Sequence, residues 1–256
     1  MDPVTLWGMG SAVLSLVVLM VMDGTDPLAI VLVPPLVLVF GGTFGATIAG
    51  GTVGDLRRVG PWFRLAFSPV PVLRPAGTVT LIADLAAVAR RSGLLELEKR
   101  LSDVDDPFLR RALQMVVDGV PAEQLRRVLE QEAAARSRED RDAARFFARM
   151  GGFAPTIGII GTVVGLVQVL HQLDDLDALG PLVGTAFVAT LWGVLSANMF
   201  WLPLSAKIRR GSQLRSTAMA LAVEGACDIQ AGLGPRSLRM RLRSLLPPSE
   251  AVAVAV

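Results

Sequence analysis

Four long apolar stretches alternate with polar segments along the chain. They cover Val4–Met22, Pro27–Gly50, Phe153–Leu173 and Leu179–Ala206. Each approaches or exceeds the roughly 20 residues that an α-helix needs to cross a bilayer. The pattern therefore predicts an all-α integral membrane protein with four transmembrane helices, arranged as two pairs on either side of a polar segment.

The polar segment has the periodicity of helices outside the membrane. Residues 78–101 read as one helix, residues 106–119 as a second, and residues 120–150 as a third that runs directly into the third span. The apolar positions that set the first of these helices are Leu81, Leu85, Val88, Leu94, Leu95 and Leu101.

The flanking segments are also expected to be helical. Residues 55–69 mix arginine with aromatic side chains, which is typical of a segment lying along the membrane surface. Residues 207–230 are expected to continue the fourth span as a cytoplasmic helix, with a disordered tail beyond Pro247.

The placement of basic residues predicts the topology. All 25 Lys and Arg residues lie in 51–152 or after residue 206, whereas the loops 23–26 and 174–179 carry aspartates and no Lys or Arg. The positive-inside rule then places both basic segments and both termini in the cytoplasm of a cell-membrane protein. The chain is therefore predicted to consist of four segments: transmembrane helices 1 and 2 (1–50), a cytoplasmic helical domain (51–152), transmembrane helices 3 and 4 (153–206), and a cytoplasmic helix and tail (207–256).

Composition argues against enzymatic or nucleic-acid-binding roles. Hydrophobic residues make up 52% of the chain and the net charge is only +2. A single cysteine, Cys227, and a single histidine, His171, leave little for metal binding or acid–base chemistry. We expect no enzyme activity, no cofactor, no metal and no nucleic-acid partner.

The four spans contain no Asp, Glu, Lys or Arg. A proton carrier normally needs an ionisable group inside the membrane, so a partner chain would have to supply it. Thr162 and Gly165 share one helical face, and Thr190 and Gly193 share another. These two narrow faces are suited to surround a guest helix, while Gly161-xxx-Gly165 also fits plain helix packing.

Five motifs in order resemble the MotA/PomA family of flagellar stator A subunits, within the MotA/TolQ/ExbB proton channel superfamily. They are VFGGTFGA (39–46), ARRSGLLELE (89–98), DGVPAEQLRRVLEQE (118–132), APTIGIIGTVVGLVQVL (154–170) and ATLWGVLSANMFWLPLSAKI (189–208). The resemblance covers nearly the whole chain. It implies a ring of A subunits, a pentamer, around a MotB-like B subunit whose transmembrane aspartate takes up the coupling ion, with torque delivered to the rotor switch protein FliG.

The resemblance also assigns roles to cytoplasmic residues. Arg90 and Glu98 match charged positions that engage the rotor, and Arg91 and Glu96 compete for the same role. On a single helix, Arg90 and Glu98 would share a face to within roughly 80°. From spacing alone they also fit ordinary solvated charges.

Within the membrane the resemblance assigns prolines and threonines. Pro155 and Pro203 match prolines associated with conformational change, although a fixed kink is also compatible with them. Thr162 and Thr190 match hydroxyls that face the ion path. Because Ala189 precedes Thr190, where sodium-driven members commonly carry a second threonine, H⁺ is favoured over Na⁺.

Two alternative functions remain open from the sequence. One is an ExbB/TolQ-like energiser of outer-membrane processes, which shares the chemistry of the last two spans. The other is a membrane scaffold that conducts no ion. A stator subunit that couples an ion channel to flagellar rotation is the function that the four-span layout favours.

Overall fold

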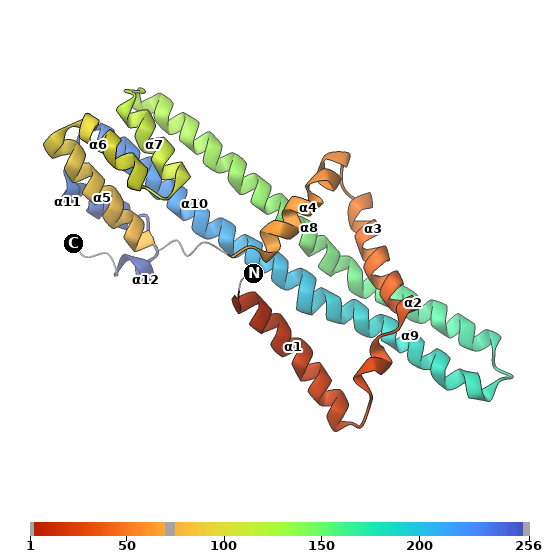
Figure 1. Ribbon diagram of the computed structural model, residues 1–256. Coiled ribbons are helices and arrows are strands. Elements are labelled where there is room, and N and C mark those ends of the chain that lie inside the picture. Colours follow the sequence, from red (N-terminus) through yellow and green to blue (C-terminus); the bar gives the residue numbers. More distant parts are fainter. Residues whose placement is uncertain (1–2, 70–74, 253–256) are drawn as a thin grey trace. The chain divides into compact units, whose positions relative to one another are not determined.

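The computed structural model describes residues 3–69 and 75–252, and these residues form helices and connecting turns with no strand among them. The chain divides into two compact units. Unit 1 combines Met1–Val70 with Arg141–Arg209, and unit 2 combines Pro71–Asp140 with Arg210–Val256. Two long helices, α8 and α10, contribute residues to both units (Figure 1).

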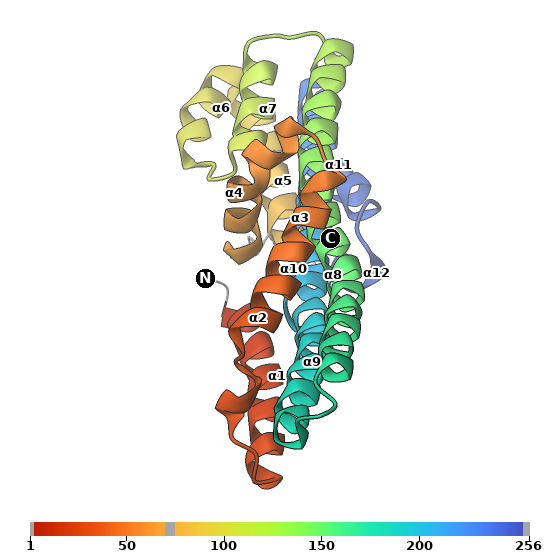
Figure 2. The same cartoon turned by 90° about the vertical axis from the view of Figure 1, so that its right-hand side faces the viewer.

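Unit 1 contains the apolar helices. They are α1 (Pro3–Met22), the 3₁₀ turn η1 (Pro27–Ile30), α2 (Val33–Leu36), the π-helical η2 (Val37–Gly41), α3 (Gly42–Ala49), α4 (Val53–Phe67), the C-terminal part of α8 (Ala122–His171), α9 (Leu176–Ser196), the π-helical η4 (Ala197–Trp201) and the start of α10 (Leu202–Gln230). The apolar part of α8 and helix α9 run side by side (Figures 1 and 2). The turn after α1 and the turn between α8 and α9 lie at the same end of this unit, the lower end in Figure 2.

The surface of unit 1 is suited to lipid. Of the residues in α1 only Met20 is buried, and Trp7, Leu14 and Val21 are among its exposed apolar side chains. An exposed apolar surface of this kind is rare on water-soluble proteins. Within residues 3–69 and 75–252, three helices are long and apolar enough to cross a bilayer, Pro3–Met22, Ala122–His171 and Leu179–Gln230, and Val33–Ala49 is a shorter apolar helix.

The second predicted span is not one helix from Pro27 to Gly50. Its first turn is the separate 3₁₀ turn η1, and the continuous helix begins at Val33. The sequence explains the break, because Pro34 and Pro35 have no N–H and fit best in the first turn of a helix. The indole of Trp192 on α9 donates to the carbonyl oxygen of Ile30 at 2.6 Å, which pairs a backbone group beside the break.

Aromatic side chains pack between α4 and the part of α8 that precedes its apolar stretch. Trp62 and Phe63 of α4 pack against Phe146 and Phe147 of α8, with ring centroids 5.1–6.4 Å apart for these contacts. The amphipathic helix α4, predicted over 55–69, is held by a capping box in which Thr52 and Asp55 exchange hydrogen bonds.

Unit 2 is a helical domain with its own core. Its elements are α5 (Pro75–Ser92), α6 (Leu94–Arg100), η3 (Leu101–Asp103), α7 (Pro107–Val117), the start of α8, the C-terminal part of α10, α11 (Pro235–Arg243) and α12 (Pro248–Ala251). The core gathers residues such as Ile82, Leu97, Leu113, Leu125 and Leu221, each fully or almost fully buried. As expected, α8 runs unbroken from this domain into the third span.

Two expectations for unit 2 were wrong. Residues 78–101 do not form one helix, because Gly93 adopts φ +84° between α5 and α6. The break rotates the second half of the pattern, so Leu94 and Leu95 are exposed and Leu97 enters the core. The tail was expected to be disordered beyond Pro247, yet Pro248–Ala251 form a helical turn, and 253–256 lie outside the described residues.

Candidate functional site

The contact between α8 and α9 depends on glycines that bring the two backbones together. A Cβ built on Gly158 would lie 2.8 Å from the carbonyl oxygen of Ala189 and 3.1 Å from the Cα of Gly193. One built on Gly193 would lie 2.7 Å from the carbonyl oxygen of Ala154. Because real Cβ atoms essentially never come this close, a side chain at either position would separate the helices.

The close contact between α8 and α9 continues toward the C-terminal end of α8. A Cβ on Gly161 would lie 2.7 Å from the Cβ of Ala189 and 2.8 Å from Leu38, and one on Gly165 would lie 2.6 Å from the Cβ of Ala186. The structure therefore places Gly161, Gly165 and Ala189 in the seam between helices of one chain. Ala189 is buried there, with 3% of its surface exposed.

Thr162 and Thr190 meet inside this seam, and both are half-buried. Their hydroxyls are hydrogen-bonded to each other. Thr162 also lies 3.2 Å from the carbonyl oxygen of Ala186, and Thr190 lies 3.3 Å from that of Gly158. The sequence predicted that each hydroxyl would lie on a face available to a partner, but not that the two would bond across the seam.

The groups that this pair can bind depend on how many protons its two hydroxyls have left to donate. Each hydroxyl carries one proton and two lone pairs. When Thr190 donates to Thr162 and Thr162 donates to the Ala186 carbonyl, both protons are used and lone pairs remain. The pair can then accept from a protonated carboxyl group or solvate a cation, whereas donating to a carboxylate requires one of its present hydrogen bonds to break.

The two site prolines occupy different helical settings. Pro155 lies within the continuous α8, where it supplies no N–H to the preceding turn. Pro203 lies in the first turn of α10, directly after the π-helical segment Ala197–Trp201. A π-helical turn leaves irregular backbone pairing and recurs at functional positions, so this region departs from regular α-helix over more than the proline alone.

The four charged candidates for rotor contact lie on two helices. Arg90 and Arg91 occupy the last turn of α5, whereas Glu96 and Glu98 lie on α6. The expected single-helix geometry for Arg90 and Glu98 was wrong, because the positive φ of Gly93 separates the two helices. Any shared surface of these residues is therefore built by the α5–α6 corner and not by helical periodicity.

The four charges also differ in what they contact. The Arg90 guanidinium lies against Gly234, where a Cβ would displace it. Glu96 accepts a hydrogen bond from Lys99 at 2.8 Å, which lowers the pKa of the Glu96 carboxyl. Arg91 lines a cavity of about 320 Å³ together with Asp84 and Arg100. Glu98 is exposed.

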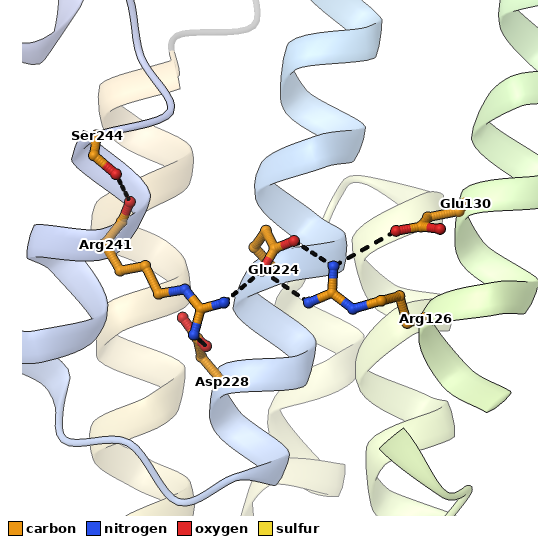
Figure 3. A network of polar contacts seen from close by, with 6 residues as sticks. All are labelled: Arg126, Glu130, Glu224, Asp228, Arg241 and Ser244. Atoms are coloured by element: carbon orange, nitrogen blue, oxygen red, sulfur yellow. Dashed lines mark hydrogen bonds and ion pairs between the residues drawn. The ribbon is translucent and has the colours of Figure 1, made fainter. Parts of the chain in front are cut away.

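A polar network in unit 2 was not found from the sequence (Figure 3). Arg126 on α8 makes a two-point ion pair with Glu224 on α10, one of its distances being 2.9 Å. Arg241 on α11 bridges Glu224 at 3.1 Å and the buried Asp228 at 2.9 Å. The network ties three helices together. The partners are up to 98 residues apart, so no local pattern could have shown it.

The surroundings shift the pKa values of the two carboxyl groups of this network in opposite directions. The hydrogen bond from Arg126 lowers the pKa of Glu224. Burial raises the pKa of Asp228, although Arg241 opposes this shift.

Comparison with known proteins places the chain among bacterial motor and channel proteins. The pattern of the MotA/TolQ/ExbB proton channel family matches residues 100–220. Motility protein A of Bacillus subtilis (strain 168) is 31% identical over 255 residues, covering 100% of this chain and 94% of the relative. Chemotaxis protein PomA of Vibrio alginolyticus is 28% identical over 246 residues, with 96% of each chain covered. The flagellar MotAB stator complex from Bacillus subtilis contains a chain of TM-score 0.88 and 31% identity, with 99% of this chain and 100% of that chain covered.

Proposed function

The chain belongs to the motility protein A branch of the MotA/TolQ/ExbB proton channel family and is a flagellar motor stator subunit; from this premise we propose how it converts an ion-motive force into torque. The observation that carries the mechanism is the hydroxyl pair Thr162–Thr190, half-buried between two apolar spans, 153–173 and 179–206, that contain no Asp or Glu. The work is ion transport and motion, with no bond-making chemistry assigned to the chain.

A MotB-like B subunit supplies the missing carboxylate. Solved MotAB complexes of similar A chains support such a partner. Its transmembrane aspartate approaches the α8–α9 seam, where the protonated acid donates to a threonine hydroxyl. Moving one elementary charge through the membrane potential provides about 2.3 kcal/mol per 100 mV, which is comparable to the strength of the hydrogen bonds that change.

Protons are the favoured coupling ion. Ala189 occupies the position before Thr190 and is packed against Gly161, so its side chain adds no oxygen to the site. A sodium ion would need several oxygen ligands in place of its hydration shell. The Thr162–Thr190 pair alone offers too few.

The topology has four crossings, with both termini in the cytoplasm. The shorter helix Val33–Ala49, together with the turn Pro27–Ile30 before it, forms the second crossing. The acidic, Lys- and Arg-free turns lie at one end of unit 1, which is consistent with that end being outside.

Torque leaves the subunit through the α5–α6 corner of unit 2. Arg90 and Glu98 contact FliG, with Arg91 and Glu96 beside them. Five A subunits form a ring around the B helices. Pro155 and the region around Pro203 let the third and fourth crossings bend as the carboxylate changes its charge.

Swimming of a strain that lacks this gene tests the proposal. We expect filaments to be assembled but paralysed, with motility restored by the wild-type gene and not by Arg90→Glu or Pro155→Leu. Arg127→Ala is the matched control, because Arg127 is an exposed arginine of unit 2 that pairs with Glu123, four residues earlier on the same helix.

The outcomes separate the rival functions. Normal swimming after deletion of this gene and of any second stator gene refutes the motor function and favours an ExbB/TolQ-like energiser. A scaffold that conducts no ion predicts that Thr190→Val is harmless. A stator loses motility with this variant while its assembly stays normal.

A further inference from the structure

A cavity of about 510 Å³ opens at one end of unit 1, away from the Thr162–Thr190 pair. It is lined by Asp55 and Trp62 of α4 and by Asp142, Arg145, Ala148 and Arg149 of α8. The lining residues recur at helical spacing, seven apart on α4 and three or four apart on α8, so each helix presents one face to the cavity. No role in ion flow or rotor contact uses these residues.

Among the residues that the structure describes, two hydrogen-bond donors of this lining have no partner. Trp62 is buried, with 3% of its surface exposed, and its indole Nε1 is unpaired. The Nε of Arg149 is also buried and unpaired, while its Nη1 donates to the carbonyl oxygen of Gly50 at 2.8 Å. Because buried polar groups are normally hydrogen-bonded, two orphan donors on residues that line one cavity are suited to a ligand that brings acceptor oxygens.

The charges of the lining add a second requirement. The two arginines are balanced by two aspartates, so the site as a whole is neutral. Asp55 is occupied through Oδ2, which accepts from Thr52, and Asp142 is occupied through Oδ1, which accepts from Arg145 at 2.9 Å. Each carboxylate keeps a second oxygen outside these hydrogen bonds. A ligand with both an anionic and a cationic group complements such a site better than a simple anion does.

The position of the cavity along the chain fixes its level in the membrane. Arg149 holds Gly50, the residue directly after the apolar helix Val33–Ala49, and lies four residues before the apolar stretch that begins at Phe153. One end of each of these two apolar segments therefore lies beside this cavity. Tryptophan is enriched at the level of the lipid headgroups, and Lys and Arg are enriched on the cytoplasmic side of the membrane.

We propose that this cavity binds the headgroup of a zwitterionic aminophospholipid, phosphatidylethanolamine, of the inner leaflet. The phosphodiester oxygens accept hydrogen bonds from Arg149, a small shift of the buried Trp62 indole brings its N–H to the same oxygens, and the ammonium group donates to Asp142 and Asp55. Arg149 is anchored by one hydrogen bond to Gly50, so its guanidinium can turn about that contact to admit the phosphate. The site rests on the membrane location of the chain and is independent of its motor role.

Lipid retention by the purified A–B complex tests this site. The complex in detergent is given an equal mixture of phosphatidylethanolamine, phosphatidylglycerol and phosphatidylcholine with matched acyl chains, and native mass spectrometry counts the lipids that remain. We expect selective retention of phosphatidylethanolamine. Trp62→Phe and Arg149→Lys, which remove the two orphan N–H groups but keep bulk and charge, should each weaken retention about tenfold, as expected for a hydrogen bond to a charged group.

Two control variants match these changes. Trp201→Phe removes another buried, unpaired indole N–H of unit 1 that does not line the cavity, and Arg57→Lys alters an exposed arginine of α4. Both should retain lipid like the wild type. Equal retention of the three lipids, or equal losses in test and control variants, overturns the proposal. So does stabilisation by free inorganic phosphate without any lipid selectivity.

Discussion

Gly158→Ala is the sharpest test of the seam between α8 and α9. The added Cβ would lie 2.8 Å from the Ala189 carbonyl oxygen and 3.1 Å from the Cα atoms of Gly193 and Thr190. Ordinary van der Waals contact begins at 3.4 Å, so the helices must separate by roughly 0.5 Å at this point. Overpacking of this kind costs about 1–3 kcal/mol, partly offset by the roughly 1 kcal/mol that alanine gains over glycine in a helix.

The same displacement reaches the hydroxyl pair. The Thr162–Thr190 hydrogen bond joins the two helices, so a separation of roughly half an ångström stretches or breaks it. We therefore expect Gly158→Ala to impair swimming more than its stability cost alone would, because it alters the geometry of the proposed ion site.

The assay compares two alanine variants of one helix. Gly152 also lies on α8, but a Cβ there meets nothing within 4 Å. Swim-ring diameter is measured for Gly158→Ala and Gly152→Ala, with membrane levels and co-purification of the B subunit as controls. If both variants swim like the wild type at equal membrane levels, the close contact is not needed and the reasoning is refuted.

Four further predictions concern Thr190 and the polar network of unit 2. Thr190→Val removes a hydroxyl at nearly constant volume, and tracking of single cells should show loss of swimming with normal co-purification of the B subunit, whereas Thr190→Ser should keep most of the speed. Glu224→Gln weakens the two-point pair with Arg126; because both side chains are partly exposed, we expect a loss of about 1–2 kcal/mol, seen as a lower Tm of the purified complex, and an unchanged Tm would contradict it. Stability should also fall in acid, because the pKa of Glu224 is lower in the folded chain than its ordinary 4.5, so its contribution is present above 4.5 and is lost as the pH falls through the folded value. Burial raises the pKa of Asp228, so its ionisation opposes folding as the pH rises, and Asp228→Asn should cost less than Glu224→Gln in thermal unfolding at pH 7.

The sequence predicted the features that depend on local pattern. Apolar runs of sufficient length indicated the membrane helices, and the unbroken charge-rich segment before Phe153 indicated that α8 continues into the third span. The break at Gly93 was missed because a glycine is compatible with both a helix interior and a helix end, and only its positive φ decides between them.

Features that depend on helix register could not be read from the chain. Thr162 and Thr190 were each identified, but their mutual hydrogen bond depends on how closely Gly158 lets two helices approach. The orphan donors of Trp62 and Arg149 depend on tertiary packing in the same way, since neither residue is unusual in its own segment.

The hydrogen bond between Trp192 and Ile30 has a consequence for biosynthesis. The two residues are 162 positions apart, and at a synthesis rate of about 5–20 residues per second the indole emerges roughly 10–30 s after the carbonyl that it pairs. Throughout that interval the irregular backbone around Ile30 must be kept away from lipid hydrocarbon, because an unpaired carbonyl there costs several kcal/mol. The first two helices therefore need to be retained by the translocon or by an insertase until α9 has been synthesised. Insertion of this protein should then be unusually sensitive to depletion of the translocon or the insertase.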